Sequence, residues 1–222
     1  MRIPNDKKIL IAAITGIVAC ISDFTVLIIL GTYYPYYNHF KNTMSALGAS
    51  TSPVSGLISV LWIILGFLFI IFGMGLKIAF RNKGRAAQLA SWSVILYGIG
   101  EGIGSGVFKA DHIGKIFTLS AYIHNFLGAI GIISILVLPL FMLKIIPGSE
   151  KRFFKLISWI VFGLCMVMMV LFTFRFSYNQ NSILAIYKGL WQRLFVLFIY
   201  IYLIIIAGFM LQKRKISKLP EN

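Results

Sequence analysis

The sequence predicts an all-α membrane protein, a single domain over residues 1–222 that forms a bundle of six transmembrane helices. Three observations lead to this prediction. Of the 222 residues, 59% are hydrophobic and only 12% are charged, which is unlike a soluble domain. The apolar residues form runs of about 20, long enough for a helix to cross a hydrocarbon core of about 30 Å. Basic residues gather in alternate connections between these runs.

The apolar runs define the expected transmembrane helices in chain order. They span residues 9–31, 57–79, 87–108, 121–143, 154–174 and 194–211. Of the 21 Lys and Arg residues, 15 lie before the first helix, after the sixth, or in and immediately beside the connections between the second and third and between the fourth and fifth. The positive-inside rule places these segments, and with them both termini, in the cytoplasm. It also accounts for the net charge of +15 without a nucleic-acid partner.

The first helix and the outer segment after it carry the first polar candidates. At 1.5 Å per residue, Asp23 lies about 12 Å below the outer end of its helix. Gly16 and Cys20 share its face, because residues three and four apart are neighbours on a helix. Residues 32–56 then open with tyrosines and continue with Ser, Thr, Gly and Pro, which favour turns. We expect this segment to lie at the membrane surface and to place Ser45 at the outer rim.

The third helix carries a carboxylate in the middle of glycines. Glu101 lies about 10 Å below the outer end of its helix, and an ionisable group in lipid costs roughly 2.5–3.5 kcal/mol. It therefore needs a partner, a proton or a water-filled cavity. Gly98, Gly102 and Gly106 form a stripe that lets helix backbones approach closely. Close packing explains this stripe as well as a cavity does.

The last three helices bring further polar groups to the same half of the bilayer. His124 lies about 5 Å below the outer end of the fourth helix, on a face with Gly128 and Gly131. The loops at that end contribute Asp111, His112, Arg175 and Arg193. We expect Glu101 to pair with Arg193 in preference to Arg175. The convergence predicts a polar pocket in the extracytoplasmic half, with these ligand-binding candidates: Asp23, Ser45, Glu101, Asp111, His124 and Arg193.

Metal binding and catalysis are the more demanding interpretations of the same residues. Side chains of His112, His124, Asp111 and Asp23 are acceptable zinc ligands, but the chain has no HxxxH or HExxH spacing. Zinc is therefore possible and not favoured. Ser45 can act as a nucleophile only beside a base. If the protein is an enzyme, which the sequence leaves open, the catalytic candidates are Ser45, Asp111 and His124.

Several short motifs resemble a known family. They are Ser45-Ala46-Leu47-Gly48 with Pro53 before the second helix, Gly104-x-Gly106-Val107-Phe108-x-x-Asp111 after the third, and Gly189-Leu190-Trp191-Gln192-Arg193 opening the sixth. In this order they resemble the DUF998 family of six-span prokaryotic membrane proteins, whose activity is uncharacterised. The resemblance implies the six-helix fold and a multi-pass location in a prokaryotic plasma membrane. It also points to Ser45, Asp111, His124 and Arg193.

Two classes of function fit these residues, and a third is weaker. In the first, the outer pocket binds a lipid or small amphiphile, and the lipid bilayer is the main partner. In the second, the protein is an intramembrane metal-dependent lipid hydrolase of the amidase or esterase type, by analogy with other multi-span enzymes. The third is a proton-coupled transporter in which Asp23 and Glu101 relay protons, although no repeat or pair of broken helices supports it.

Overall fold

The structure of the chain is a computed structural model that describes residues 4–113, 116–146, 151–179 and 181–216. Of the basic residues used to predict topology, Arg2, Lys115 and Lys218 lie outside the described residues. The same holds for the side chains of residue 151 and of residues 213–216. Within the described ranges the chain is almost entirely helical.

The helices follow the apolar runs closely. In chain order the elements of the first half are α1 (Asn5–Thr32), η1 (Met44–Gly48), α2 (Ser55–Ala79), η2 (Arg81–Lys83), α3 (Gly84–Tyr97), η3 (Gly98–Gly104) and α4 (Ser105–Val107). Those of the second half are β1 (His112–Ile113), β2 (Ile116–Phe117), α5 (Leu119–Leu136), α6 (Leu138–Met142), α7 (Lys151–Thr173), η4 (Phe174–Phe176), α8 (Ile183–Ile186) and α9 (Lys188–Ile216). The strands pair as a small antiparallel hairpin.

Among the described residues, five stretches are long and apolar enough to cross a membrane: α1, α2, α5 with α6, α7 with η4, and α9. The expected third span, residues 87–108, is not among them, because the structure divides it into three consecutive pieces. The α-helix α3 gives way to a π-helical turn, η3, and then to α4. The glycine-rich sequence from Gly98 to Gly104 permits this wider turn, since glycine restricts the backbone least. The chain nevertheless runs from 84 to 107 without leaving a helical conformation.

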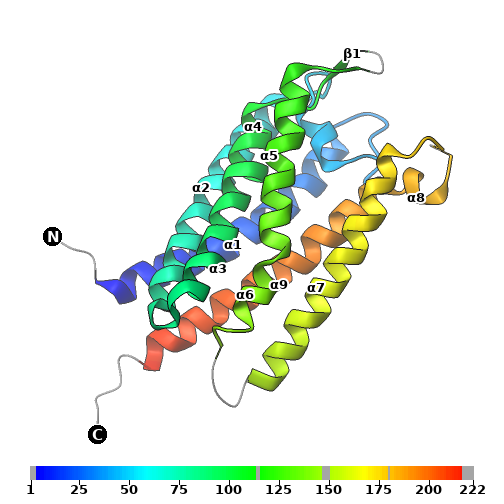
Figure 1. The fold of residues 1–222 in the computed structure, drawn as a ribbon. Coiled ribbons are helices and arrows are strands. Elements are labelled where there is room, and N and C mark those ends of the chain that lie inside the picture. Colours follow the sequence, from blue (N-terminus) through cyan, green and yellow to red (C-terminus); the bar gives the residue numbers. More distant parts are fainter. Residues whose placement is uncertain (1–3, 114–115, 147–150, 180, 217–222) are drawn as a thin grey trace, which may run out of the picture.

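The bundle has two distinct ends. Figure 1 places the first and last described residues at one end, which we call the terminal end. The β1–β2 hairpin, η1 and α8 lie at the opposite end, which we call the hairpin end. Helix α1 packs between α2 and α9, α2 packs on α3 and η3, and η3 packs on α5. Helix α7 packs mainly on α9 and contacts α5 only sparsely.

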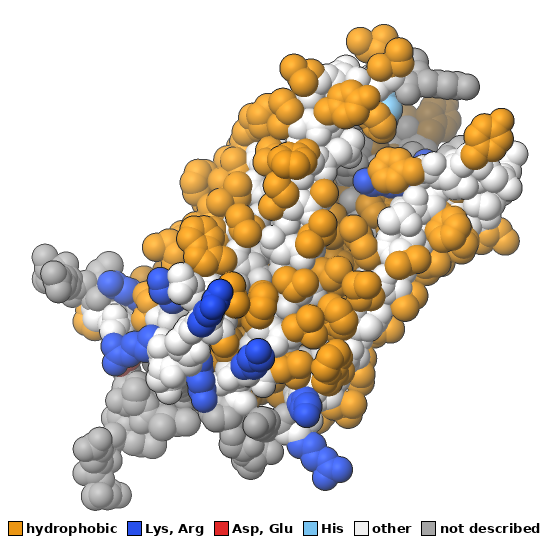
Figure 2. Space-filling view, in the orientation of Figure 1, with side chains coloured by type: hydrophobic (Ala, Val, Ile, Leu, Met, Phe, Trp, Pro, Cys, Tyr) orange, Lys and Arg blue, Asp and Glu red, His pale blue; other side chains and the backbone are white. Residues whose placement is uncertain are grey.

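The surface between the two ends is apolar. Figure 2 shows hydrophobic side chains over the length of the helices and Lys and Arg side chains gathered at the terminal end. Outward-facing residues such as Ile21, Val60 and Phe153 are half or more exposed, which suits contact with lipid rather than water. Helix composition and exterior together fit a multi-pass integral membrane protein.

Candidate functional site

A cavity of about 260 Å³ opens within the hairpin half of the bundle. Its wall comes from α1, α2, the α3–η3–α4 segment, α5, α7 with η4, and α9, and Met44 and Ser45 of η1 border it as well. This volume is far larger than the roughly 10–15 Å³ that one water molecule requires. The surface is hollowed at the hairpin end between α5 and α7 (Figure 2), where these two helices make few contacts.

Asp23 of α1 lies on the cavity wall in a short chain of hydroxyl groups. Its side chain is buried, and the Tyr200 hydroxyl of α9 donates to Oδ2 at 2.5 Å. The Tyr97 hydroxyl of α3 lies 2.9 Å from that of Tyr200. Asp23 Oδ1 accepts no hydrogen bond of good geometry from the described residues, although the Trp62 side chain lies close by. One acceptor atom of a buried carboxylate is therefore left for something inside the cavity.

Glu101 reaches the same cavity from the π-helical turn η3. Turns of this kind occur frequently at functional sites. A Cβ atom placed on Gly128 of α5 would come within 2.9 Å of Glu101 Oε1, so the missing side chain at Gly128 provides the room for this carboxylate. Ser105, one helical turn further on, is buried beside Glu101 and has no hydrogen bond of good geometry among the described residues.

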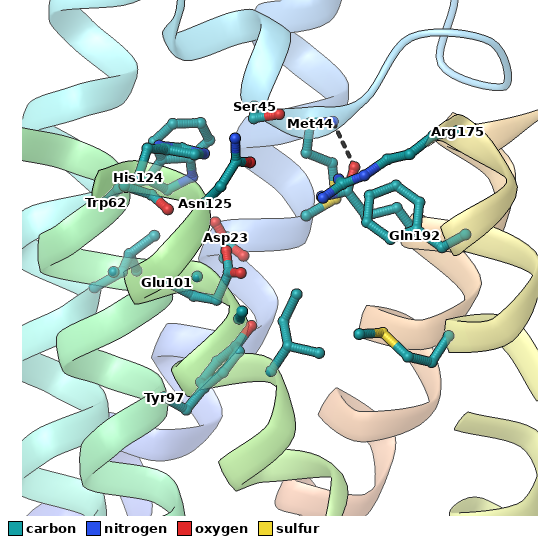
Figure 3. A pocket seen from close by; sticks show the side chains of 18 of the residues that line it. Asp23, Met44, Ser45, Trp62, Tyr97, Glu101, His124, Asn125, Arg175 and Gln192 are labelled. Atoms are coloured by element: carbon teal, nitrogen blue, oxygen red, sulfur yellow. Dashed lines mark hydrogen bonds between the residues drawn. The ribbon is translucent and has the colours of Figure 1, made fainter. Parts of the chain in front are cut away.

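Arg175 supplies a positive charge to the cavity. In Figure 3 it reaches in from the α7 side, opposite Glu101 and His124. The rings of Phe172 and Phe176 hold its guanidinium group, with centroids 4.0 and 4.4 Å from Cζ. Its charge acts favourably on the Glu101 carboxylate. Two carboxylates and one guanidinium group thus share one cavity.

The expectation that Glu101 pairs with Arg193 is wrong, because Arg193 binds the outer loop instead. Its guanidinium group donates to the Asn42 carbonyl at 2.9 Å, the Gly189 carbonyl at 3.0 Å and the Tyr37 hydroxyl at 2.6 Å. The Tyr37 hydroxyl donates in turn to the Thr43 carbonyl. Arg193 therefore fixes the loop before η1 to the start of α9 and is not part of the described cavity wall.

His124 and Ser45 both border the cavity. Because the Phe108 carbonyl can only accept, the His124 Nδ1–H group donates to it at 2.9 Å, and the neutral ring keeps a lone pair on Nε2. The Ser45 hydroxyl lies 3.0 Å from that of Thr43. The neighbouring Met44 backbone N–H donates to Gln192 Oε1 at 2.8 Å, drawn as the dashed line in Figure 3, which ties η1 to α9.

Asp111 and His112 lie outside the cavity wall, at the hairpin. Asp111 accepts hydrogen bonds from the Ser50 backbone N–H at 2.7 Å and from its hydroxyl at 2.6 Å. Slight burial raises the pKa of Asp111, but the bonds from Ser50 outweigh it and hold the pKa below its ordinary value. The His112 ring lies against Phe117, with centroids 4.7 Å apart.

The structure therefore does not bring the zinc candidates or the catalytic candidates together. Asp111 is bound to Ser50 and His124 to a backbone carbonyl, so Ser45, Asp111 and His124 form no hydrogen-bonded triad. In the described part of the chain, no three His, Cys, Asp or Glu side chains are grouped so that they could hold a metal ion. What the structure does bring together is Asp23, Glu101, His124 and Ser45.

Several residues of the cavity wall were missed by the sequence analysis. They are Tyr97, Ser105, Asn125, Gln192 and Tyr200. Two of them carried a usable signal: Ser105 lies four residues after Glu101 and so on the same face, and Gln192 belongs to the motif that opens the sixth span. Tyr200 lies within a continuous apolar run, where nothing in the spacing distinguishes it.

Comparison with known proteins identifies a family and nothing closer. No curated protein and no solved structure matches the chain. The sequence model of DUF998, described as a protein of unknown function, matches residues 17–208. The matched region contains every residue of the cavity wall named above. It covers most of the chain and confirms the resemblance seen in the motifs: the protein belongs to the DUF998 family.

Proposed function

We propose that this protein binds a lipid or small amphiphile in the cavity of its hairpin half. The observation that carries the proposal is the composition of the wall. Apolar side chains, among them Leu65, Ile132 and Met169, surround a few polar groups that converge on one space. Binding sites for small molecules generally combine mostly apolar walls with few, well-placed polar groups. An amphiphile has both kinds of surface, and the opening between α5 and α7 gives it a path from the bilayer.

A proton-coupled transporter is the second candidate, and one observation favours it. The Tyr97 and Tyr200 hydroxyls and Asp23 form a continuous hydrogen-bonded chain beside Glu101. Such chains can pass protons. Amphiphile binding asks less of the structure, because it needs only the one cavity and no second conformation.

The proposal includes a topology of six spans with both termini in the cytoplasm. The continuous helical stretch from 84 to 107 supports a sixth span. The described chain ends and most of the visible Lys and Arg side chains lie together at the terminal end (Figures 1 and 2), which supports this orientation. In a variant lacking Cys20 and Cys165, cysteines introduced at Ser50 and Asn181 should react with an impermeant thiol reagent in intact cells. If only a cysteine introduced at Asn82 reacts, the orientation is the reverse of the one proposed.

Native mass spectrometry of the detergent-purified protein tests ligand binding. We expect a co-purified lipid or amphiphile whose retention depends on the cavity. Ala129 is exposed at the cavity's rim, so Ala129→Trp should block entry and lower retention about tenfold, which corresponds to about 1.4 kcal/mol. Val60, exposed on α2 away from the cavity, provides the control Val60→Trp. Equal retention in both variants would contradict the proposal.

A further inference from the structure

We propose that the ligand presents a primary ammonium group, which binds between Asp23 and Glu101. This inference rests on the proposed function and specifies the chemistry of the head group. The part of the cavity concerned, which we call the acidic end, is formed by Asp23, Glu101 and Ser105 together with the rings of Trp62, Phe69 and Tyr97.

The charges of the cavity wall favour a cationic group. Two carboxylates border the cavity, and within the described wall Arg175 is the one permanent cation. The His124 ring adds a positive charge only if Nε2 is also protonated, because Nδ1 already donates to the Phe108 carbonyl. Buried charge without a counter-charge is unfavourable in a membrane interior. A positively charged group on the ligand balances the second carboxylate, whereas a ligand without a positive charge does not.

The acidic end also has unused hydrogen-bonding capacity. Asp23 is 6% exposed and Ser105 is 4% exposed. Asp23 Oδ1 lies near the Trp62 side chain and Ser105 Oγ near the Glu101 carboxylate, but neither atom makes a well-formed hydrogen bond among the described residues. Buried polar atoms are normally satisfied, so these two point to a missing partner. A primary ammonium group carries three N–H donors and no acceptor, which matches acceptors better than a hydroxyl group would.

Aromatic rings line the acidic end. Phe69 and Tyr97 meet edge to face with centroids 5.1 Å apart, and Phe69 lies 5.7 Å from Tyr200. Trp62 and Tyr97 border the cavity beside the carboxylates. Aromatic faces attract cations, and the primary ammonium group of lysine is among those that pack on them. The acidic end therefore offers opposite charge, acceptors and aromatic faces together.

The ammonium group can belong to a lipid or to a soluble amine, and two matched pairs of probes distinguish these sources. For lipid, native mass spectrometry compares dioleoyl phosphatidylethanolamine with dioleoyl phosphatidylglycerol at equal concentration. For a soluble ligand, the thermal unfolding temperature is measured with ethanolamine and with ethylene glycol, which has a hydroxyl group in place of the amine. We expect the ethanolamine lipid to be retained about tenfold better, a difference of one decade in the dissociation constant.

The variant Asp23→Asn should abolish this preference, because it removes the charge while keeping an oxygen that can accept from Tyr200. Asp111→Asn is the matched control, since it makes the same change on a carboxylate outside the cavity wall. If Asp23→Asn does not fold, Gly128→Ala decides instead: its new methyl group must displace the Glu101 carboxylate, and it should weaken the preference for the amine.

Two outcomes support the inference. An amine preference that is lost in Asp23→Asn and kept in Asp111→Asn identifies a lipid head group. If ethanolamine stabilises the protein while neither lipid is preferred, and Asp23→Asn abolishes this stabilisation, the ligand is a soluble amine. Equal retention of both lipids, with ethanolamine no better than ethylene glycol, would overturn it. Retention that remains sensitive to Ala129→Trp would then leave the proposed function standing, whereas insensitivity to that variant would refute the proposed function itself.

Discussion

The two halves of this bundle are built from the same helices but differ in how completely their buried polar groups are hydrogen-bonded. In the terminal half, the Ser91 hydroxyl donates to the Gly73 carbonyl at 2.7 Å, and the Ser158 and Tyr202 hydroxyls lie 2.7 Å apart. In the hairpin half, Asp23 Oδ1 and Ser105 Oγ remain without well-formed hydrogen bonds among the described residues. Satisfied polar groups stabilise a fold, whereas unsatisfied ones beside a cavity indicate a site for a ligand.

Glycine shows the same contrast. A Cβ atom on Gly75, in the terminal half, would overlap the Cβ atom of Ala12, so this glycine lets α1 and α2 pack closely. A Cβ atom on Gly128, in the hairpin half, would meet the carboxylate of Glu101. There the absent side chain makes room for a functional group. Two glycines that look alike in the sequence therefore serve different purposes, helix packing at Gly75 and the site at Gly128.

The largest effect on stability is expected at Arg193, which anchors the outer loop. Arg193→Met removes three hydrogen bonds made by a charged group, each worth about 1.5–3 kcal/mol. Thermal unfolding in detergent should show a loss at least as large as that of one such bond. Lys188→Met, which removes a cation at the start of the same helix, is the control and should have little effect. Equal losses would show that Arg193 does not anchor the loop.

Overpacking the terminal half should separate stability from binding. Gly75→Leu forces new atoms into the contact with Ala12, and overpacking of this kind costs typically about 1–3 kcal/mol. The melting temperature should fall while the folded protein retains its co-purified ligand. Gly128→Ala should do the reverse, with a small change in melting temperature and a clear loss of ligand. Parallel effects in the two variants would remove the distinction between the halves.

A double-mutant cycle tests the electrostatic coupling across the cavity. Glu101→Gln and Arg175→Gln should each change thermal stability, and the double variant should differ from the sum of the two. Coupling energies within such polar networks are about 0.5–3 kcal/mol. The same cycle with Arg193→Gln in place of Arg175→Gln should be additive, because Arg193 binds the outer loop. Additivity in both cycles would remove Arg175 as the partner of Glu101.

The smallest effect concerns the contact between Asp111 and Ser50 at the surface. Because the pKa of Asp111 in the folded protein is lowered from 3.8, its contribution to stability is present above that pH. It is lost as the pH falls through the lower, folded-state value. Asp111→Asn should therefore unfold at a lower temperature than the wild type at neutral pH, and the difference should shrink on acidification below about pH 4. A difference independent of pH would rule out the ionised contact.

Much of the fold and part of the site could be predicted from the sequence. Helix rise and apolar periodicity placed Asp23, Glu101 and His124 in the same half of the bilayer, and all three line the cavity. The depth of a residue in the bilayer does not tell which way its side chain points around the helix axis. For that reason the sequence could not tell that Arg175 enters the cavity while Arg193 binds the outer loop. The π-helical turn at Glu101 was also out of reach, since a glycine-rich stretch fits close α-helical packing equally well.

The most direct test of the central claim is an experimental structure of the wild-type protein, purified without added lipid and resolved well enough to show bound molecules. The account predicts a non-protein molecule in the cavity, with its polar group within hydrogen-bonding distance of Asp23 or Glu101 and its apolar part directed towards the opening between α5 and α7. A cavity filled only by ordered water, or closed by side chains that turn Asp23 and Glu101 towards protein partners, would contradict it.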